Sequence, residues 1–433
     1  MKKLIALLLA VCLCGVLFAA CGESTEPAKT GTETGTAVAK DLKIGLIMVG
    51  DESEGYTYAH MEGIKAAAKA LGIADNQLVW AYKVEEDSSC SDKAIEMIGD
   101  GCTLIVSNSY GHQDYMYDVA KDYPNVNFVA MTGDYAAISG LTNFFNAFTG
   151  VYESRYVSGV VAGLKLQEMI DNNEILDANK DADGNIKIGY VGAFPYAEVV
   201  SGYTAFFLGI KSVVPNVVME VEYTDSWFSI EKEAASAQSL MSKNCVIIGQ
   251  HADSTGAPAA VEAAHKAGTY TNVYSVGYNV SMLDAAPTVA LTSATNTWSV
   301  YYTELFSAFL NGKEIPQDWA KGYTADAVAI TDLGTACAEG TAEKVAEVEA
   351  KIKDGSLKVF DTATFTVGGE KIEKADVDMS YYDFSTGTPQ LVHQGETVNA
   401  IKTENGVSFF DESTFRAAPY FSLRIDGITE PQQ

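Results

Sequence analysis

The sequence predicts an α/β protein of two lobes, each a doubly wound parallel sheet, followed by a small β-containing extension. From Leu42 onward, short runs rich in valine and isoleucine alternate with segments whose apolar residues recur at helical spacing. Nearly continuous apolar strands that alternate with helices are typical of parallel sheets covered on both faces. Roughly 390 residues follow the N-terminal segment, which is enough chain for two such lobes.

Residues 1–21 have the pattern of a secretory signal peptide that ends in a lipid-attachment motif. Lys2 and Lys3 precede an apolar run that ends in small residues and then Cys21. Phe18 stands where such motifs usually carry leucine. We expect Cys21 to become the lipidated first residue, anchoring the protein to the outer face of the cytoplasmic membrane. The alternative is an ordinary cleaved signal with Cys21 an incidental thiol.

A flexible tether is predicted for residues 22–40. The segment consists mainly of Gly, Ser, Thr, Ala and Glu, and it has too little apolar surface to order itself. The folded part is expected to begin at Leu42, where apolar density rises in LKIGLIMVG. No later apolar run reaches the length that spans a bilayer, so the lipid is the expected membrane attachment.

The predicted strands are short runs dominated by apolar residues, at 43–49, 78–84, 103–107, 127–130, 187–192, 217–221, 246–249, 273–276 and 289–292. Helices are predicted between them, for example at 62–71, 90–100 and 231–243. The longest helix candidate, 152–169, has only small residues in its middle and lies between two blocks of strand–helix units.

This order divides the chain into two lobes and an extension. Lobe 1 is expected to comprise residues 41–148 plus about 280–325, and lobe 2 residues 149–279 plus about 326–360. The crossings between them are expected near Phe148, near Tyr278 and within 320–330. Residues 361–433, rich in Gly, Thr, Asp and aromatic residues, are expected to form the C-terminal extension that packs on the lobes.

Charge and cysteine content exclude several classes of protein. The formal net charge of −28 and the absence of basic runs argue against nucleic acid as a partner. Four cysteines remain beyond Cys21, which is too few for a disulfide scaffold, and no CxxC spacing suggests zinc. Cys90 and Cys102 flank one predicted helix, so a bridge between them stays an open possibility. No cofactor is expected.

The loops that follow the predicted strands are the expected binding region, because ligands of open parallel sheets lie beyond the carboxyl ends of the strands. These loops carry aromatic rings that suit a flat ligand held between two faces, with Asp and Asn to bond its edges. The alternative is that the aromatic residues only seal the interface between the lobes. The candidate ligand-binding residues are Tyr56, Thr57, Tyr58, Asn108, Ser109, Tyr110, Phe194, Trp227, Phe228, His251, Asp253, Tyr278, Asn279 and Trp298.

Several segments together resemble a known family. DESEGYTYAHMEG, SNSYGHQDYM, YESRYVSGVVAG, DSWFSIEKEAASAQSLM, QHADS and VGYN occur in the order found in basic membrane protein/PnrA-like lipoproteins, over about residues 42–361. These lipoproteins are the substrate-binding components of ABC importers. The resemblance implies a type I periplasmic-binding-protein fold whose lobes close about a hinge on a purine nucleobase or nucleoside, and ABC permease subunits as partners.

The resemblance also assigns roles to single residues. Tyr56 and Trp227 match the two positions whose rings stack on the base, and Asn108, Ser109, His251, Asp253 and Asn279 match positions at or near the cleft. Nucleoside-binding relatives have an Asp at the position of Asn279 and a Lys near residues 296–298, which this chain lacks. Ribose recognition is therefore in question, and a free base with Trp298 filling the ribose space is a second possibility.

Other functions remain as alternatives to purine import. The same fold could bind another small ligand such as a sugar, or feed a signalling kinase instead of a transporter. A nucleosidase that uses Asp253 is a third possibility, but no activated nucleophile or catalytic motif accompanies that residue. The sequence Asn179–Gly184 begins like a calcium loop, yet its twelfth position is Tyr190 instead of Glu. We therefore expect a binding protein and not an enzyme.

Overall fold

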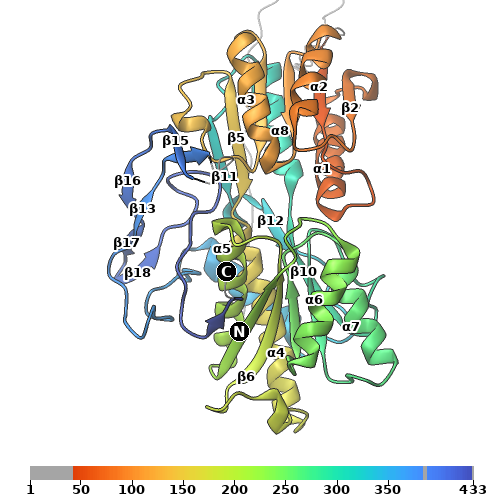
Figure 1. The fold of residues 1–433 in the computed structure, drawn as a ribbon, viewed down its shortest axis with the longest axis vertical. Helices are drawn as coiled ribbons and strands as arrows, with labels where there is room; N and C mark the ends of the chain where they lie inside the picture. Colours follow the sequence, from red (N-terminus) through yellow and green to blue (C-terminus); the bar gives the residue numbers. More distant parts are fainter. Residues whose placement is uncertain (1–41, 384–387, 432–433) are drawn as a thin grey trace, which may run out of the picture. The chain divides into compact units, whose positions relative to one another are not determined.

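The computed structural model describes residues 42–383 and 388–431, all of which belong to one compact unit, Val38–Gln433. The expected signal peptide, the lipid site Cys21 and the tether lie outside the described residues. Within that unit, two lobes with a central sheet each stack one above the other, and the C-terminal extension runs beside both of them (Figure 1). The predicted fold class is confirmed, because each sheet is parallel over most of its width and carries helices on both faces.

Lobe 1 contains a six-stranded parallel sheet with the order β11-β5-β4-β3-β1-β2. Its strands are β1 (Ile44–Ile47), β2 (Leu78–Ala81), β3 (Leu104–Ser107), β4 (Asn127–Met131), β5 (Phe144–Thr149) and β11 (Asp318–Lys321). Helices α1 (Gly55–Leu71) and α8 (Trp298–Leu310) cover one face, and α2 (Ser88–Gly99) and α3 (Gln113–Asp122) cover the other. Separate apolar clusters on the two faces explain why the strand sequences are apolar almost throughout.

Lobe 2 contains a seven-stranded sheet with the order β12-β10-β9-β8-β6-β7-β19, in which only β12 is antiparallel. Its strands are β6 (Ile186–Gly192), β7 (Val217–Tyr223), β8 (Ile247–Gln250), β9 (Tyr274–Tyr278), β10 (Ala290–Asn296), β12 (Val328–Ile330) and β19 (Ile428–Thr429). Helices α6 (Ile230–Ser242) and α7 (Gly256–Lys266) cover one face, while α4 (Val151–Asp171) and α5 (Ala197–Lys211) cover the other. Helix α9 (Thr341–Lys353) packs on α4.

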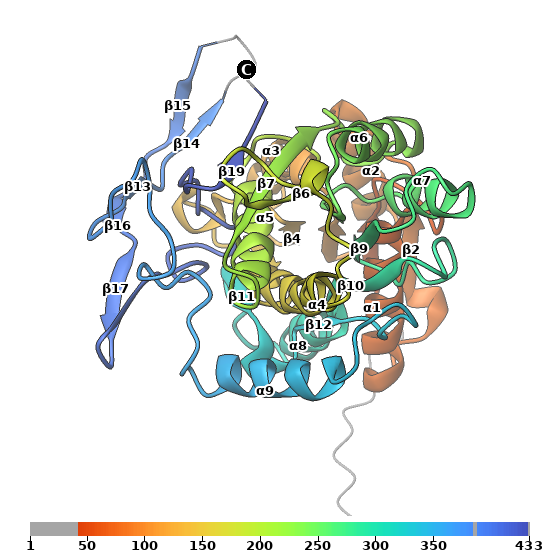
Figure 2. The same ribbon diagram turned by 90° about the horizontal axis from the view of Figure 1, so that it is seen from below.

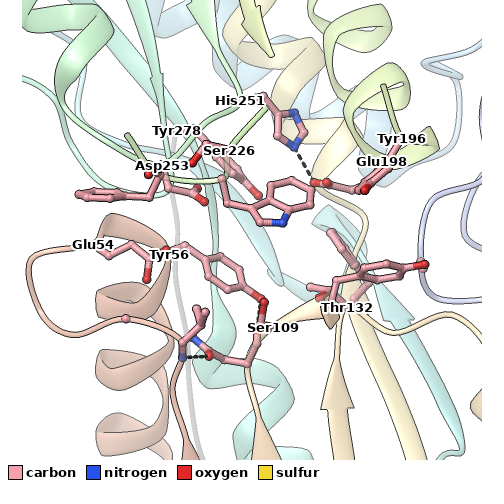
Figure 3. Close-up of a pocket in the computed structure, with 18 of the residues that line it drawn as sticks. Glu54, Tyr56, Ser109, Thr132, Tyr196, Glu198, Ser226, His251, Asp253 and Tyr278 are labelled. Carbon is pink, nitrogen blue, oxygen red and sulfur yellow. Dashed lines mark hydrogen bonds and ion pairs between the residues drawn. The ribbon is translucent and has the colours of Figure 1, made fainter. Parts of the chain in front are cut away.

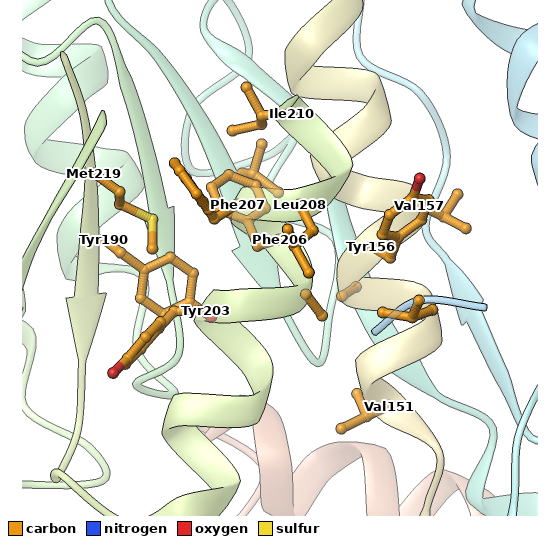
Figure 4. Close-up of a cluster of buried hydrophobic side chains, with 14 of the residues drawn as sticks. Val151, Tyr156, Val157, Tyr190, Tyr203, Phe206, Phe207, Leu208, Ile210 and Met219 are labelled. Carbon is orange, nitrogen blue, oxygen red and sulfur yellow. The ribbon is translucent and has the colours of Figure 1, made fainter. Parts of the chain in front are cut away.

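The close pairing of α4 with α5 explains the small residues predicted in the middle of the longest helix. A Cβ at Gly159 would lie 2.2 Å from the carbonyl oxygen of Phe206, and one at Gly209 would lie 2.1 Å from that of Tyr156. Only glycine permits the two backbones to come so near. Figure 4 shows Phe206 and its neighbours on α5 filling the space beside this crossing.

Within the described residues, the lobes are joined by three crossings. They lie between β5 and α4, between β10 and α8, and between β11 and β12. The second crossing was expected near Tyr278, with lobe 1 resuming at about residue 280, and the structure corrects this. Strand β10 pairs with β9 and stays in lobe 2, so the chain returns to lobe 1 only at Trp298.

The extension forms three two-stranded antiparallel pairs before its end joins lobe 2. The pairs are β13 (Asp376–Asp378) with β16 (Thr397–Asn399), β14 (Tyr381–Asp383) with β15 (Gln390–His393), and β17 (Ile401–Glu404) with β18 (Val407–Phe410). Strand β19 then lies parallel to β7 at the edge of the lobe 2 sheet. Seen from below, β13 to β17 stand to one side of the lobe 2 sheet (Figure 2).

Short 3₁₀ turns connect several elements, at η1 (Asp75–Gln77), η2 (Tyr110–His112), η3 (Ala136–Ile138), η4 (Asp177–Asn179) and η5 (Tyr323–Ala325). The bridge left open between Cys90 and Cys102 does not form, since both residues are free buried thiols near opposite ends of α2. Asp181, in the calcium-like segment, instead accepts bonds from the backbone N–H groups of Asp183 and Asn185 and closes a turn before β6.

Candidate functional site

A cavity of about 760 Å³ lies between the two lobes, at the carboxyl ends of their strands. Its lining comes from the loops after β1, β2, β3 and β4 of lobe 1, from the loops after β6, β7 and β8 and the end of β9 in lobe 2, and from the extension. Figure 3 shows Glu54 and Tyr56 on one side and His251, Asp253 and Tyr278 on the other. The volume is in the range of about 300–1,000 Å³ that small-molecule sites occupy.

On the lobe 1 side, a hydrogen-bonded loop fixes the ring of Tyr56. Its hydroxyl donates to the carbonyl oxygen of Asn108, 2.6 Å away. The side chain of Asn108 in turn accepts from the backbone N–H of Val49 at 2.8 Å and donates to Thr57 Oγ1 at 3.1 Å. Thr57 is fully buried beneath the cavity lining, where it also donates to Glu54. Tyr56 is thus held at the N-terminus of α1 by the loops after β1 and β3.

On the lobe 2 side, an aromatic cluster supports the ring of Trp227. Phe194 lies behind the lining, stacked on Tyr196 with centroids 5.1 Å apart and edge-on to Trp227 at 5.0 Å. Trp227 and Tyr196 themselves line the cavity. The carbonyl oxygen of Trp227 also accepts from the backbone N–H of Asp253 at 2.8 Å, which joins two of the strand-end loops.

Asp253 is the most deeply buried acid of the cavity, and two asparagines orient it. Asn279 Nδ2 donates to Asp253 Oδ1 at 2.6 Å, and Asn279 Oδ1 accepts from Asn296 Nδ2 at 3.1 Å. Asn279 adopts a left-handed backbone (φ 62°), which asparagine tolerates better than most residues. Burial raises the pKa of Asp253, and the charge of Glu54 raises it further. Glu54 belongs to the opposite lobe, and burial raises its pKa as well.

His251 is a neutral hydrogen-bonding group in this site. Its Nε2 lies 2.7 Å from Glu198 Oε1, as the dashed line in Figure 3 marks. Burial lowers the pKa of His251 despite the neighbouring carboxylate, so the ring is uncharged and Nε2–H donates to Glu198. Arg155 lies 3.6 Å from the ring centre of Tyr278 and donates to the carbonyl oxygen of Gln250 at 2.6 Å, which fixes the Tyr278 ring from behind.

The structure brings most of the sequence-predicted residues to the cavity but not all of them. Those that line it are Tyr56, Asn108, Ser109, Tyr110, Trp227, Phe228, His251, Asp253 and Tyr278. Thr57, Phe194 and Asn279 are second-row residues that hold lining residues in place. Tyr58 lies on α1, is 42% exposed and is not part of the lining, because it follows Tyr56 by two positions and a helix turns it away.

Trp298 does not fill the space it was expected to fill. Its ring is fully buried, stacked on His60 with centroids 4.2 Å apart and set edge-on behind Tyr56 at 6.4 Å. Because Trp298 is the first residue of α8, its side chain packs into the core between α8 and α1 instead of facing the cavity. The side chain supports Tyr56 from behind.

Sequence reasoning missed the carboxylates and the extension residues of the lining. Asp51, Glu54, Glu85, Asp134 and Glu198 all line the cavity in addition to Asp253. Asp51 and Glu54 stand in the loop after the first strand, and Asp134 follows the fourth, so the strand-end rule could have found them. Arg416, Ala418 and Pro419 could not be found in this way, because they are remote in sequence from every strand end that forms the cavity.

The lining cations are fewer than the carboxylates and each is paired. Lys83 Nζ lies 2.6 Å from Asp51 Oδ2, and Arg416 Nη1 lies 3.6 Å from Asp134 Oδ2. The cavity therefore presents aromatic faces together with more carboxyl groups than cations.

Comparison with known proteins gives a consistent result. The family model for ABC transporter substrate-binding proteins of the PnrA-like type matches residues 42–362. A purine-binding protein of Brucella abortus is 30% identical over 350 residues, covering 79% of this chain and 91% of that protein. A Haloferax volcanii protein named as an ABC transporter glucose-binding protein is 26% identical and covers 83% of this chain and 84% of its own.

Solved structures are similar in fold. An ABC transporter solute-binding protein from Conexibacter woesei aligns with a TM-score of 0.54 at 19% identity, over 73% of this chain and 98% of that one. Within the part of the chain that the structure describes, no helix combines the length and the apolar character needed to cross a membrane.

Proposed function

The chain belongs to the PnrA-like family of ABC transporter substrate-binding proteins, and from this premise we propose that its cavity binds a purine nucleobase or nucleoside. Family membership makes it an extracytoplasmic protein that delivers a small molecule to ABC permease subunits. Its family and fold are those of binding proteins and not of enzymes. The proposed identity of the ligand, in contrast, is argued from the residues that line the cavity.

One observation carries the proposal: aromatic rings from opposite lobes line the same cavity. Tyr56 is held there by a hydrogen bond and Trp227 by an aromatic cluster. A planar base between two such rings gains about 1–3 kcal/mol from each by analogy with base stacking in nucleic-acid complexes. Each ring belongs to a different lobe, so the ligand favours the closed form over the open one.

The polar groups of the cavity suit a neutral ligand with N–H or O–H donors. Asp253 and Glu54 face the cavity from opposite lobes and can accept such donors. The surplus of carboxylates disfavours an anion, so phosphorylated nucleotides are expected to be rejected. Purine bases and nucleosides are uncharged and carry several donors, which fits this lining.

The choice between base and nucleoside depends on the free space in the cavity. Trp298 lies behind Tyr56, so it does not occupy the room that a ribose would need. Asn279 donates to Asp253 and does not line the cavity, so Asp253 is the lobe 2 group that can bond an edge of the base. The free space supports a nucleoside, and the missing lysine near residues 296–298 supports a free base.

Calorimetric titration of the unit from Val38 onward tests the proposal. Adenine, hypoxanthine, guanine and the matching nucleosides form the panel, with inosine incubations followed for release of hypoxanthine. We expect tight binding of at least one purine and no product. Failure of every purine to bind would refute the proposed ligand while leaving family and fold unchanged.

Glucose belongs in the same panel as a second candidate. The Haloferax volcanii relative is named for glucose, and a lining rich in carboxylates can accept bonds from sugar hydroxyls. Binding of glucose without any purine would favour this candidate. The two aromatic walls make the purine the better-supported ligand.

We also propose that Cys21 carries the lipid that holds the protein at the membrane. The basic start, the apolar run and the small residues before Cys21 support this. Cys21→Ser in the full-length chain should move the protein from the membrane fraction to the soluble fraction, with Cys337→Ser as the matched control. Tight membrane association of the Cys21→Ser variant would contradict the proposal.

A further inference from the structure

We propose that the C-terminal extension forms a third wall of the cavity and that its residues Arg416–Pro419, together with Asp134 and Tyr110, make a distal subsite for a hydroxylated substituent such as the ribose of a nucleoside. The inference rests on the proposed purine ligand. The family model matches residues 42–362, so this wall lies beyond the residues that the model matches.

Contacts within the lining define the subsite. Arg416, Ala418 and Pro419 line the same cavity as Tyr56 and Trp227. Arg416 faces Asp134, whose carboxylate also accepts from Tyr110 at 3.5 Å and from Gln113 at 3.1 Å. Asp134 follows β4, so this part of the cavity is built jointly by lobe 1 and the extension.

The wall is fixed in place by bonds to both lobes. Glu412 is buried and accepts from Ser201 Oγ of α5 at 2.9 Å and from the backbone N–H of Tyr420 at 2.6 Å. Five residues after Glu412, the N–H of Ala417 donates to Asp318 Oδ1 on β11 at 2.9 Å. The segment thus crosses from lobe 2 to lobe 1 and is anchored by a side chain at one end and by its backbone at the other, as a preorganised binding surface requires.

Aromatic packing adds to these anchors. Phe421 stacks on Phe360 with centroids 4.3 Å apart, and Tyr381 lies 4.3 Å from Tyr135 of lobe 1. The hydroxyl of Tyr381 also donates to Asp114 on α3 at 2.8 Å. Residues 412–421 are therefore part of the folded body and not a loose tail.

The position of the subsite points to a substituent and not to the base. Tyr110 lies 6.3 Å from Tyr196, and Tyr196 lies 6.1 Å from Trp227, measured between ring centroids. The hydroxyl of Tyr110 donates to Asp134, which in turn pairs with Arg416. A base stacked on Trp227 would leave this region for the group attached to it.

The chemistry of the pair suits hydroxyl groups. A hydroxyl can both donate to Asp134 and accept from Arg416. The contacts of Arg416 within the protein are long, at 3.3 Å to the carbonyl oxygen of Ala418, 3.5 Å to that of Pro419 and 3.6 Å to Asp134. A ligand oxygen at normal hydrogen-bond distance would be a better acceptor for the guanidinium than any of these.

Two variants and one control test the subsite. Ala418→Phe fills the space beside the pair, Arg416→Ala removes the guanidinium, and Arg424→Ala removes the same side chain from a position where it pairs with Glu430 outside the cavity. Each is titrated with adenine, hypoxanthine, guanine and their nucleosides, and its thermal unfolding is compared with that of the wild type.

We expect Ala418→Phe to weaken nucleosides at least tenfold and Arg416→Ala to weaken them about fivefold. Free bases should change less than twofold in both variants, and Arg424→Ala should leave all affinities within twofold. Wild-type nucleoside affinity in both variants, an equal loss for bases and nucleosides, or a wild type that binds only bases would overturn the subsite while the purine proposal stands. A wild type that binds no purine would overturn both.

Discussion

The walls that the two lobes contribute to the cavity differ from the wall that the extension contributes. The lobes present flat rings, Tyr56 and Trp227, from loops that lie within residues 42–362, which the family model matches. The extension presents Arg416 beside a lobe carboxylate, on a segment held by buried polar contacts. Under the proposed function, two kinds of interaction therefore meet in one cavity: stacking from the lobes and charge-assisted bonding from the extension.

The largest expected effect is the rejection of a negatively charged ligand. Adenosine monophosphate should bind at least a hundredfold more weakly than adenosine, because its phosphate would enter a cavity in which carboxylates outnumber cations. Competition calorimetry measures the ratio. Equal affinities would mean that Arg416 or Lys83 leaves its carboxylate to bind phosphate. The cavity would then accept anions, contrary to the prediction.

Removal of the lobe 2 ring tests the stacking wall. Trp227→Ala should weaken purine binding ten- to hundredfold, the equivalent of about 1.4–2.7 kcal/mol, because one face of the base loses its partner. Trp80→Ala, on an edge strand outside the cavity, is the matched control, since Trp80 stacks on Tyr82 and is not part of the lining. Affinity that is unchanged in Trp227→Ala would remove this residue from the site.

The polar anchoring of the extension should appear in the pH dependence of stability. Burial raises the pKa of Glu412 from its ordinary value of 4.5 to about 7, so the folded state binds this proton more tightly than the unfolded chain does. The stabilisation of the folded state by protonated Glu412 is therefore complete below pH 4.5 and is lost as pH rises through 7. A rise from pH 5 to pH 7 should therefore lower the contribution of Glu412 to the free energy of unfolding by about 2 kcal/mol.

Urea unfolding of the Glu412→Gln variant isolates this contribution. The variant should lose that part of the pH dependence, while Glu373→Gln, at an exposed position of the extension, should keep the wild-type profile. Identical pH profiles for wild type and Glu412→Gln would show that the buried carboxylate does not titrate in this range.

The smallest effect concerns the hydroxyl that positions the lobe 1 ring. Tyr56→Phe keeps the ring and removes the bond to the carbonyl oxygen of Asn108. A neutral hydrogen bond contributes about 0.5–1.5 kcal/mol, so purine affinity should fall about two- to tenfold. The ring of Trp227, by contrast, packs on Phe194 and Tyr196. A larger loss of purine affinity in Tyr56→Phe than in Trp227→Ala would mean that the hydroxyl of Tyr56 contributes more to binding than the ring of Trp227.

The sequence predicts the lobes well because their strands are buried on both faces and leave an unambiguous apolar pattern. It misplaces the second crossing, since nothing in the residues near Tyr278 distinguishes a return to lobe 1 from one more strand of lobe 2. The loops that line the cavity follow from strand ends, and Tyr56 and Trp227 are correctly placed among them.

The sequence does not predict the direction of individual side chains. Asn279 and Trp298 belong to the right segments, but Asn279 turns toward Asp253 and Trp298 packs into the core between α1 and α8. Arg416 enters through tertiary packing of a segment more than 80 residues beyond the last lobe 1 strand. No local pattern encodes a contact of that range.

The double anchoring of residues 412–421 has a kinetic consequence. The extension contacts lobe 1 through the bonds from Ala417 to Asp318 and from Tyr381 to Asp114, and it contacts lobe 2 through Glu412. Separation of the lobes must therefore break the contacts of the extension with one lobe or the other. These contacts do not depend on which ligand is bound, so they slow opening for every ligand alike. Ligand exchange should therefore be slower than the affinity alone would give, because opening has to detach one end of residues 412–421.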